Sequence, residues 1–214
     1  MKHSRLSIVP SVFALALLAA CSDEPATAPA GEAVQASDAA IEQPVMGPER
    51  RVLAFGNSLF AGYNVAPEDS YPAKLEVALR AQGINARVVK AGVSGDTTAG
   101  GLSRVGWTLE PEVDGLIVTL GGNDLLRGLD PAQARSNIEG ILQAAQAADV
   151  DVLLIGMQAP GNFGPAYKSE FDALYPELAE SYGALFLESF FVGLSEGGTI
   201  PAPAQAREWF QSDG

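Results

Sequence analysis

The chain has 214 residues, of which 47% are hydrophobic, so it is long and apolar enough for one globular domain with a sizeable core. It contains 26 acidic and 13 basic residues, which give a formal net charge of -13 at pH 7. A chain of this charge is repelled by a polyphosphate backbone, which excludes nucleic acid as an expected partner but leaves a small neutral substrate open.

Residues 1–20 have the pattern of a secretory signal peptide. Lys2 and Arg5 precede an apolar run over residues 12–20, which is too short to remain in a bilayer as a spanning helix. The run ends in Leu-Ala-Ala-Cys at Cys21, which resembles a bacterial lipobox; the alternative is a plain secretory signal with an incidental cysteine. Because Cys21 is the only cysteine, an intramolecular disulfide is impossible.

We expect Cys21 to be the acylated first residue of the mature protein and to anchor it in the cell envelope, facing the periplasm. By resemblance to known lipoproteins, Ser22 after the cysteine favours the outer membrane. Residues 22–48 are rich in Ala, Pro, Glu, Asp and Thr and contain no aromatic residue, so they offer little apolar area to bury. They are predicted to be a disordered tether, because Pro25, Pro29 and Pro44 interrupt the alternative, a helical element.

The predicted order is therefore a leader at 1–20, an anchored tether at 21–48 and one folded domain at 49–214. Within the domain, short apolar runs predict strands over residues 52–55, 86–90, 116–120, 152–156 and 184–187. Amphipathic stretches predict helices over residues 71–82, 98–109, 131–148 and 166–182.

The apolar runs are continuous rather than alternating, which is typical of parallel strands covered on both faces. Alternating strands and helices imply right-handed crossovers and an α/β fold, a three-layer α/β/α sandwich. We expect a flavodoxin-like parallel sheet of five strands in the order 2-1-3-4-5. Asp130 before Pro131 is a predicted helix N-cap, and Gly83 and Gly183 occupy the expected helix C-termini.

Three polar, glycine-rich loops follow the first three predicted strands. They are Gly-Asn-Ser-Leu at 56–59, Gly-Val-Ser-Gly-Asp at 92–96 and Gly-Gly-Asn-Asp at 121–124. Loops that leave the carboxyl ends of parallel strands face one another across a crevice, where ligands bind. The sequence therefore predicts an active site built from these loops.

Ser58, in the first loop, is a candidate nucleophile, which needs a neighbouring base to take its proton. Attack on an ester carbonyl develops an oxyanion, and the backbone N–H groups of Ser58 and Gly95 with the side-chain amide of Asn123 could stabilise it. Three structural alternatives stay open: a helix-capping role for Ser58, a tight turn at Gly95 and an Asx-turn at Asn123.

Other chemistries have less support. Phe60 occupies the second glycine position of Gly-x-Ser-x-Gly, which disfavours an α/β-hydrolase fold, and no phosphate-binding or dinucleotide-binding glycine motif follows a strand. Asp96 and Asp124 are better explained by capping or loop hydrogen bonds than as metal ligands, so neither a metal nor a cofactor is expected. Residues 157–163 could form a wall of an acyl or aryl pocket or an ordinary long loop.

The three loops resemble those of the SGNH (GDSL-type) serine hydrolases, in particular periplasmic arylesterases, acyl-thioesterases and lysophospholipases. The resemblance covers roughly residues 51–214. It implies that Ser58 is the nucleophile, that Gly95 and Asn123 help to form the oxyanion hole, and that Asp213 belongs to the terminal Asp-x-x-His that completes the triad. The chain departs from the family at Asn57, where Asp is usual.

A second departure is that the chain stops at Gly214, before the motif histidine, and its only histidine is His3. We expect a fragment that also lacks a C-terminal helix and is nearly inert as given; the alternative is a non-catalytic relic.

The expected function is hydrolysis of a small carboxylic ester or thioester through an acyl-enzyme at Ser58, by a monomer anchored to the membrane through lipid. The alternatives are an envelope lipoprotein that binds a ligand without turnover, and a carbohydrate acetylesterase.

Overall fold

One sheet of five parallel strands forms the centre of the computed structural model, which describes residues 44–192. The strands are β1 Met46–Gly56, β2 Ile84–Gly92, β3 Gly115–Thr119, β4 Asp151–Ile155 and β5 Leu185–Leu187. Their order across the sheet is β2-β1-β3-β4-β5, which confirms the predicted flavodoxin-like topology. Cys21, most of the predicted tether and Asp213 lie outside the described residues.

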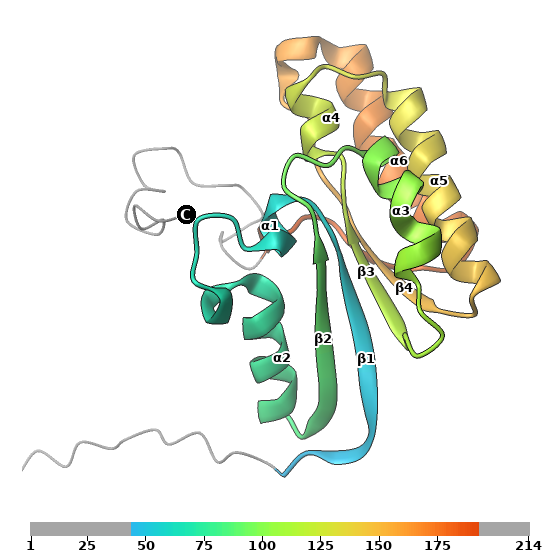
Figure 1. The fold of residues 1–214 in the computed structure, drawn as a ribbon. Helices are drawn as coiled ribbons and strands as arrows, with labels where there is room; N and C mark the ends of the chain where they lie inside the picture. The colour runs from blue at the N-terminus through green and yellow to red at the C-terminus, as the bar shows by residue number, and fades with distance from the viewer. Residues whose placement is uncertain (1–43, 193–214) are drawn as a thin grey trace, which may run out of the picture. The chain divides into compact units, whose positions relative to one another are not determined.

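Helices cover both faces of this sheet (Figure 1). On one side lie α1 Ser58–Ala61 and α2 Tyr71–Ala81, and on the other side lie α3 Thr98–Thr108, α5 Pro131–Ala147 and α6 Pro165–Tyr182. The short helix α4 Gly122–Leu126 follows β3, and two 3-10 turns, η1 Pro67–Asp69 and η2 Gly161–Phe163, lie in loops. Within residues 44–192, no helix combines the length and hydropathy needed to cross a membrane.

The alternation of side chains along each strand explains why the apolar runs are continuous. In β1, Leu53 and Phe55 belong to the core shared with α3, α5 and α6, whereas Ala54 packs on the opposite face with Phe60 of α1 and Leu75 of α2. Successive strand residues point to opposite faces, so a strand covered on both sides needs apolar residues at every position.

The predicted caps at Asp130 and Gly183 are confirmed. Asp130 is the N-cap of α5, and its carboxylate accepts a hydrogen bond from the backbone N–H of Ala132 at 3.0 Å, with Pro131 in the first turn. Gly183 ends α6 with a φ of 65°, in the left-handed region that glycine enters without steric cost.

One boundary prediction is wrong, because β1 begins at Met46, inside the stretch assigned by composition to the tether. The N–H of Met46 donates to the carbonyl of Gly83 at 3.0 Å, and Met46 is paired with Ile84. The register is interrupted between Met46 and Arg50. This pairing uses backbone groups, which every residue type has. The strand at residues 46–48 therefore cannot be recognised from their amino-acid composition.

Candidate functional site

Ser58 lies at the first position of α1, directly beyond the carboxyl end of β1. Its neighbour Asn57 is the N-cap: the Asn57 side-chain oxygen accepts a hydrogen bond from the N–H of Leu59 at 3.1 Å, and Asn57 is only 4% exposed. The alternative in which Ser58 caps the helix is therefore wrong. Within residues 44–192 the Ser58 hydroxyl has no hydrogen-bond partner, and the side chain is partly exposed.

The first and second loops are in direct contact. The N–H of Val93, just after β2, donates to the carbonyl of Gly56 at 2.9 Å. A Cβ atom on Gly92 would overlap the backbone of Phe60 and Ala61, so α1 can pack over the end of β2 only because that position is glycine. This contact brings the segment after β2 to the N-terminus of α1, where Ser58 lies.

Gly95 lies in a tight turn, as one of the sequence alternatives proposed. Its φ is 84°, and the N–H of Asp96 closes the turn on the carbonyl of Val93 at 3.1 Å. The guanidinium of Arg127 donates to the carbonyl of Gly95 at 2.9 Å. The Gly95 carbonyl shares its peptide with the N–H of Asp96, so this peptide is held from both sides, by Arg127 and by Val93.

Asn123 connects the second loop to the third. It is the second residue of α4, and its side-chain Nδ2 donates to the backbone carbonyl of Asp96 at 2.8 Å. It therefore lies in a helix and not in an Asx-turn. A side-chain amide has two N–H groups, so one can hold the loop while the other is available to an oxyanion.

The two loop carboxylates make the protein hydrogen bonds that the sequence favoured. Asp124 is 2% exposed and accepts from the N–H of Thr98 at 2.9 Å and from its hydroxyl at 2.6 Å. Asn137 of α5 donates to the same hydroxyl at 2.9 Å, while Asp96 pairs with Arg104. Across residues 44–192, no three His, Cys, Asp or Glu side chains are grouped to hold a metal ion.

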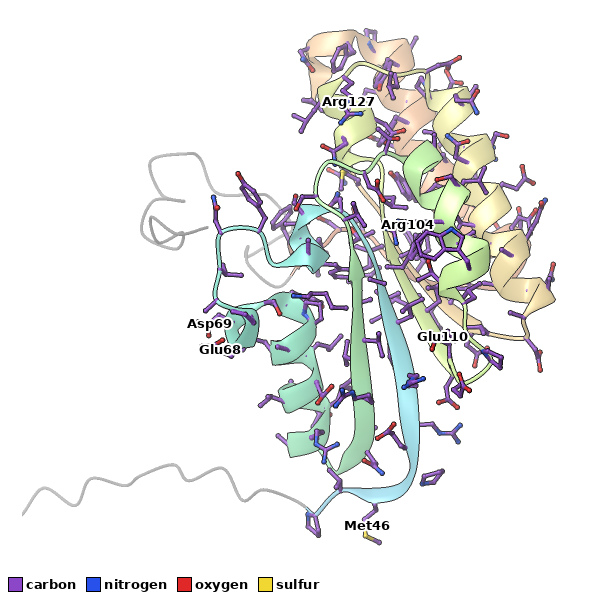
Figure 2. The ribbon with its side chains drawn as sticks, in the orientation of Figure 1. Met46, Glu68, Asp69, Arg104, Glu110 and Arg127 are labelled. Atoms are coloured by element: carbon purple, nitrogen blue, oxygen red, sulfur yellow. The ribbon has the colours of Figure 1, made fainter. Side chains whose placement is uncertain are left out.

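Arg104 is a site residue that the sequence analysis missed. It is 8% exposed, and its guanidinium donates to the carboxylate of Asp96 at 2.7 Å and to the carbonyls of Ala91 at 2.8 Å and Gly56 at 3.0 Å. Its charged carbon lies 3.9 Å from the centre of the Phe55 ring. Figure 2 shows Arg104 between α3 and the sheet, with Arg127 beside α4.

A signal for Arg104 exists in the sequence. The core-facing positions of α3 are occupied by Thr98, Gly101, Arg104 and Val105, which recur with the helical period. An arginine at such a position has to find buried acceptors, and the ends of the adjacent strands supply them. A charged residue on the apolar stripe of helix 98–109 was therefore a detectable candidate.

Residues 157–163 lie against the third loop. The sulfur of Met157 is 3.1 Å from the position that a Cβ on Gly122 would take. Phe163 packs on Tyr167 with ring centres 4.9 Å apart, and the Tyr167 hydroxyl donates to the carbonyl of Leu129 at 2.8 Å. Phe163 also lies 3.0 Å from the position that a Cβ on Gly128 would take, so the segment contacts both α4 and the loop that follows it.

Of the predicted site residues, Ser58, Gly95 and Asn123 are brought to one end of the sheet by loops that hydrogen-bond to one another. Asp213 lies outside the described residues. The arrangement places a hydroxyl at the start of α1, at the same end of the sheet as the loops that carry Gly95 and the Asn123 amide. Such a set suits nucleophilic attack on a carbonyl and stabilisation of the resulting oxyanion.

Known proteins are similar to this chain in sequence and in fold. A model of the GDSL-like lipase/acylhydrolase family matches residues 54–213. The esterase TesA of Pseudomonas aeruginosa is 38% identical over 144 residues, 67% of this chain and 72% of that protein. Thioesterase 1/protease 1/lysophospholipase L1 of Escherichia coli is 35% identical over 164 residues, 76% of this chain and 73% of that protein. The crystal structure of AlinE4, an SGNH-hydrolase family esterase, is 50% identical with a TM-score of 0.66, covering 77% of this chain and 92% of that one.

Proposed function

Because the chain belongs to the GDSL-like lipase/acylhydrolase family, we propose that it is a serine esterase that hydrolyses carboxylic esters or thioesters through an acyl-enzyme on Ser58. The observation that carries the proposal is the direct joining of the three loops. Val93 donates to Gly56, and Asn123 donates to Asp96. These bonds support a site in which the serine and two oxyanion donors act on one carbonyl.

In the proposed reaction, the Ser58 oxygen attacks the carbonyl carbon of the substrate while a base removes the hydroxyl proton. The carbonyl π electrons move to oxygen, and the resulting oxyanion accepts hydrogen bonds from Ser58 N–H, Gly95 N–H and the Asn123 amide. The alcohol or thiol leaves with the proton. Water then attacks the acyl-enzyme, releases the acid and restores Ser58. Asp213 is proposed to orient the base.

The assay is hydrolysis of p-nitrophenyl acetate and butyrate by the protein as its gene encodes it. Ser58→Ala is expected to abolish hydrolysis, whereas Ser103→Ala is a matched control, since Ser103 is exposed on α3 and donates only to the carbonyl of Gly100. A fluorophosphonate probe should add its mass to the parent and to Ser103→Ala. Equal labelling of Ser58→Ala would refute the nucleophile assignment.

The substrate class is tested with a panel of aryl esters, acyl thioesters, lysophospholipids and acetylated sugars. The names of the relatives, an esterase and a thioesterase 1/protease 1/lysophospholipase L1, support esters, thioesters and lysophospholipids as substrate classes. Turnover of acetylated sugars alone would favour the carbohydrate acetylesterase alternative. If the folded protein neither hydrolyses the panel nor reacts with the probe, the ligand-binding lipoprotein alternative replaces the esterase.

We also propose that the enzyme is held at the cell envelope through a lipid on Cys21, facing the periplasm and sorted to the outer membrane. The pattern Leu-Ala-Ala-Cys and the Ser22 that follows support this proposal. Mass spectrometry of the membrane fraction should find acylated Cys21 as the first residue, and Cys21→Ser should release the protein from the membrane. A mature chain with a free Cys21 thiol would contradict it.

A further inference from the structure

We propose that Arg104 is a positioning residue for the esterase reaction, because one buried guanidinium ties together the segments that carry Ser58, Gly95 and Asn123. This inference rests on the proposed function. Arg104 touches no reacting atom; it acts through the backbone of the loops. Its side chain reaches the site from α3, which lies on the face of the sheet opposite α1.

The first contact fixes the approach to the nucleophile. Arg104 Nη2 donates to the carbonyl of Gly56, the last residue of β1 and two positions before Ser58. The same carbonyl accepts the N–H of Val93. The end of β1 is therefore held by two donors, one from α3 and one from the loop after β2, which restricts the direction in which the chain enters α1.

The other two contacts fix the loop that carries Gly95. Arg104 Nη1 donates to the carbonyl of Ala91 at the end of β2, and Nε donates to the carboxylate of Asp96 at 2.7 Å. The backbone carbonyl of Asp96 in turn accepts the side-chain amide of Asn123. Arg104 thus connects to both proposed oxyanion donors, directly through the residue after Gly95 and by one further bond to Asn123.

Only arginine can make this set of contacts. Its planar guanidinium carries five N–H donors in a fixed fork, so three donors can reach three acceptors that lie in different directions. Lysine keeps the positive charge and can pair with Asp96, but its single ammonium nitrogen lacks the fork that spans the carbonyls of Gly56 and Ala91. Arg104→Lys therefore keeps the positive charge but removes the hydrogen bonds to the two carbonyls, so it tests the geometry alone.

The consequence for catalysis follows from how oxyanion donors work. They stabilise the developing charge fully only if they already point at it, because the energy needed to reorient them during the reaction would offset the energy of the hydrogen bonds. A shift of the loops affects the transition state more than substrate binding. For this reason Arg104→Lys is expected to lower kcat by about 10-fold to 100-fold, in line with the cost of a misplacement of about 1 Å, while KM changes by less than about threefold.

The test compares kcat and KM of the parent, Arg104→Lys and Arg50→Lys in the protein as its gene encodes it. Arg50 is a matched control because it is exposed and pairs with Asp114 on the opposite end of the sheet. Circular dichroism and thermal melts establish that each variant is folded at the assay temperature. A folded Arg104→Lys with the kcat of Arg50→Lys overturns the inference.

A double-mutant cycle with Asn123→Ala distinguishes positioning from general stability. If Arg104 aligns the donors, Asn123→Ala costs less in kcat in the Arg104→Lys background than in the parent, because the donor there is already misaligned. Independent, additive losses in kcat overturn the inference. If Arg104→Lys does not fold, Asp96→Asn replaces it in the same cycle, since it removes the charge that Arg104 contacts without changing the side-chain size.

Failure of the positioning role of Arg104 can be distinguished from failure of the proposed esterase function. If hydrolysis does not depend on Ser58, the esterase proposal fails, and the positioning is then judged from ¹⁵N–¹H spectra. Shifts of the Gly95 backbone and Asn123 side-chain signals in Arg104→Lys, with signals of α5 unchanged, support the arrangement of the loops. Unshifted Gly95 and Asn123 signals overturn it.

Discussion

The side-chain Nδ2 of Asn123 donates to the backbone carbonyl of Asp96 at 2.8 Å, so the amide is oriented before any substrate is present. Its helix is held as well, because Asp124, the next residue, accepts two hydrogen bonds from Thr98 in the interior. A donor that is fixed in advance costs little reorganisation when negative charge develops beside it. Asn123 therefore combines a structural bond with a proposed catalytic one.

The first prediction concerns this amide. Asn123→Ala is expected to lower kcat by about 100-fold to 1,000-fold, the usual effect of removing one oxyanion donor. Asn123→Asp should be at least as damaging, because a carboxylate repels both the oxyanion and the carbonyl of Asp96. Steady-state kinetics with p-nitrophenyl butyrate measure both effects. A kcat within twofold of the parent in folded Asn123→Ala would remove Asn123 from the proposed mechanism.

The sheet and its strand order could be predicted from the sequence because strands that are buried on both faces are continuous apolar runs. Leu53, Ala54 and Phe55 are all apolar since two different layers pack against them. Helix α4 could not be predicted, because its five residues are too few to show a helical period. Helix α4 is stabilised instead by tertiary hydrogen bonds from Thr98 to Asp124, which cannot be inferred from the helix propensities of its residues.

The candidate site could be predicted where a polar, glycine-rich loop follows a strand, and this is why Ser58, Gly95 and Asn123 could be named as candidates from the sequence. It was not predictable where backbone carbonyls are the partners. The acceptors of Arg104 include the carbonyls of Gly56 and Ala91, which every residue type possesses. Such contacts appear only when the strands are placed side by side.

The second prediction concerns Asn57, where the family usually has Asp. Asn and Asp are similar N-caps, so Asn57→Asp should change the free energy of unfolding and kcat only mildly. Asn57→Ala loses the bond to the N–H of Leu59 and should lower the free energy of unfolding by about 1 kcal/mol. Urea denaturation measures the stability of both variants. A complete loss of activity in Asn57→Asp would show that Asn57 acts on the substrate.

The third prediction is a pH dependence of stability at Asp114. Hydrogen bonds from the Arg51 N–H and then from the Arg50 guanidinium hold the pKa of this carboxyl below its ordinary value of 3.8. The stabilisation is therefore present above pH 3.8 and is lost as the pH falls through the lower pKa of the folded protein. Asp114→Asn should lower Tm at pH 7, and the difference from the parent should shrink below pH 3.8.

Asp114 is exposed, so the difference in Tm should also shrink in high salt, which screens surface charges. Arg50→Gln should lower Tm less in the Asp114→Asn background than in the parent, because its partner is already neutral. A difference in Tm between parent and Asp114→Asn that is equal at pH 7 and pH 2 would contradict the role of the ionised carboxylate.

The last prediction concerns Tyr175, which is 1% exposed and donates its hydroxyl to the carbonyl of Leu120 at 2.9 Å. Burial, and then the charge of Asp124, raise the pKa of Tyr175 well above 10.0, so the hydroxyl keeps its proton. Tyr175→Phe leaves the buried carbonyl without this donor and should lower the free energy of unfolding by about 1 to 3 kcal/mol. Tyr182→Phe is the control, because its hydroxyl lies nearer to solvent and bonds to Glu139 and Gln143.

Because Leu120 precedes the loop with Asn123, Tyr175→Phe should also lower kcat more than Tyr182→Phe does at equal temperature. Chemical denaturation and kinetics on the two variants measure the two effects separately. Equal losses of stability in Tyr175→Phe and Tyr182→Phe would mean that the bond to Leu120 carries no special weight. A stability loss confined to Tyr175→Phe with an unchanged kcat would contradict the predicted effect on the loop. The Tyr175 hydroxyl would then stabilise the fold without affecting the position of Asn123.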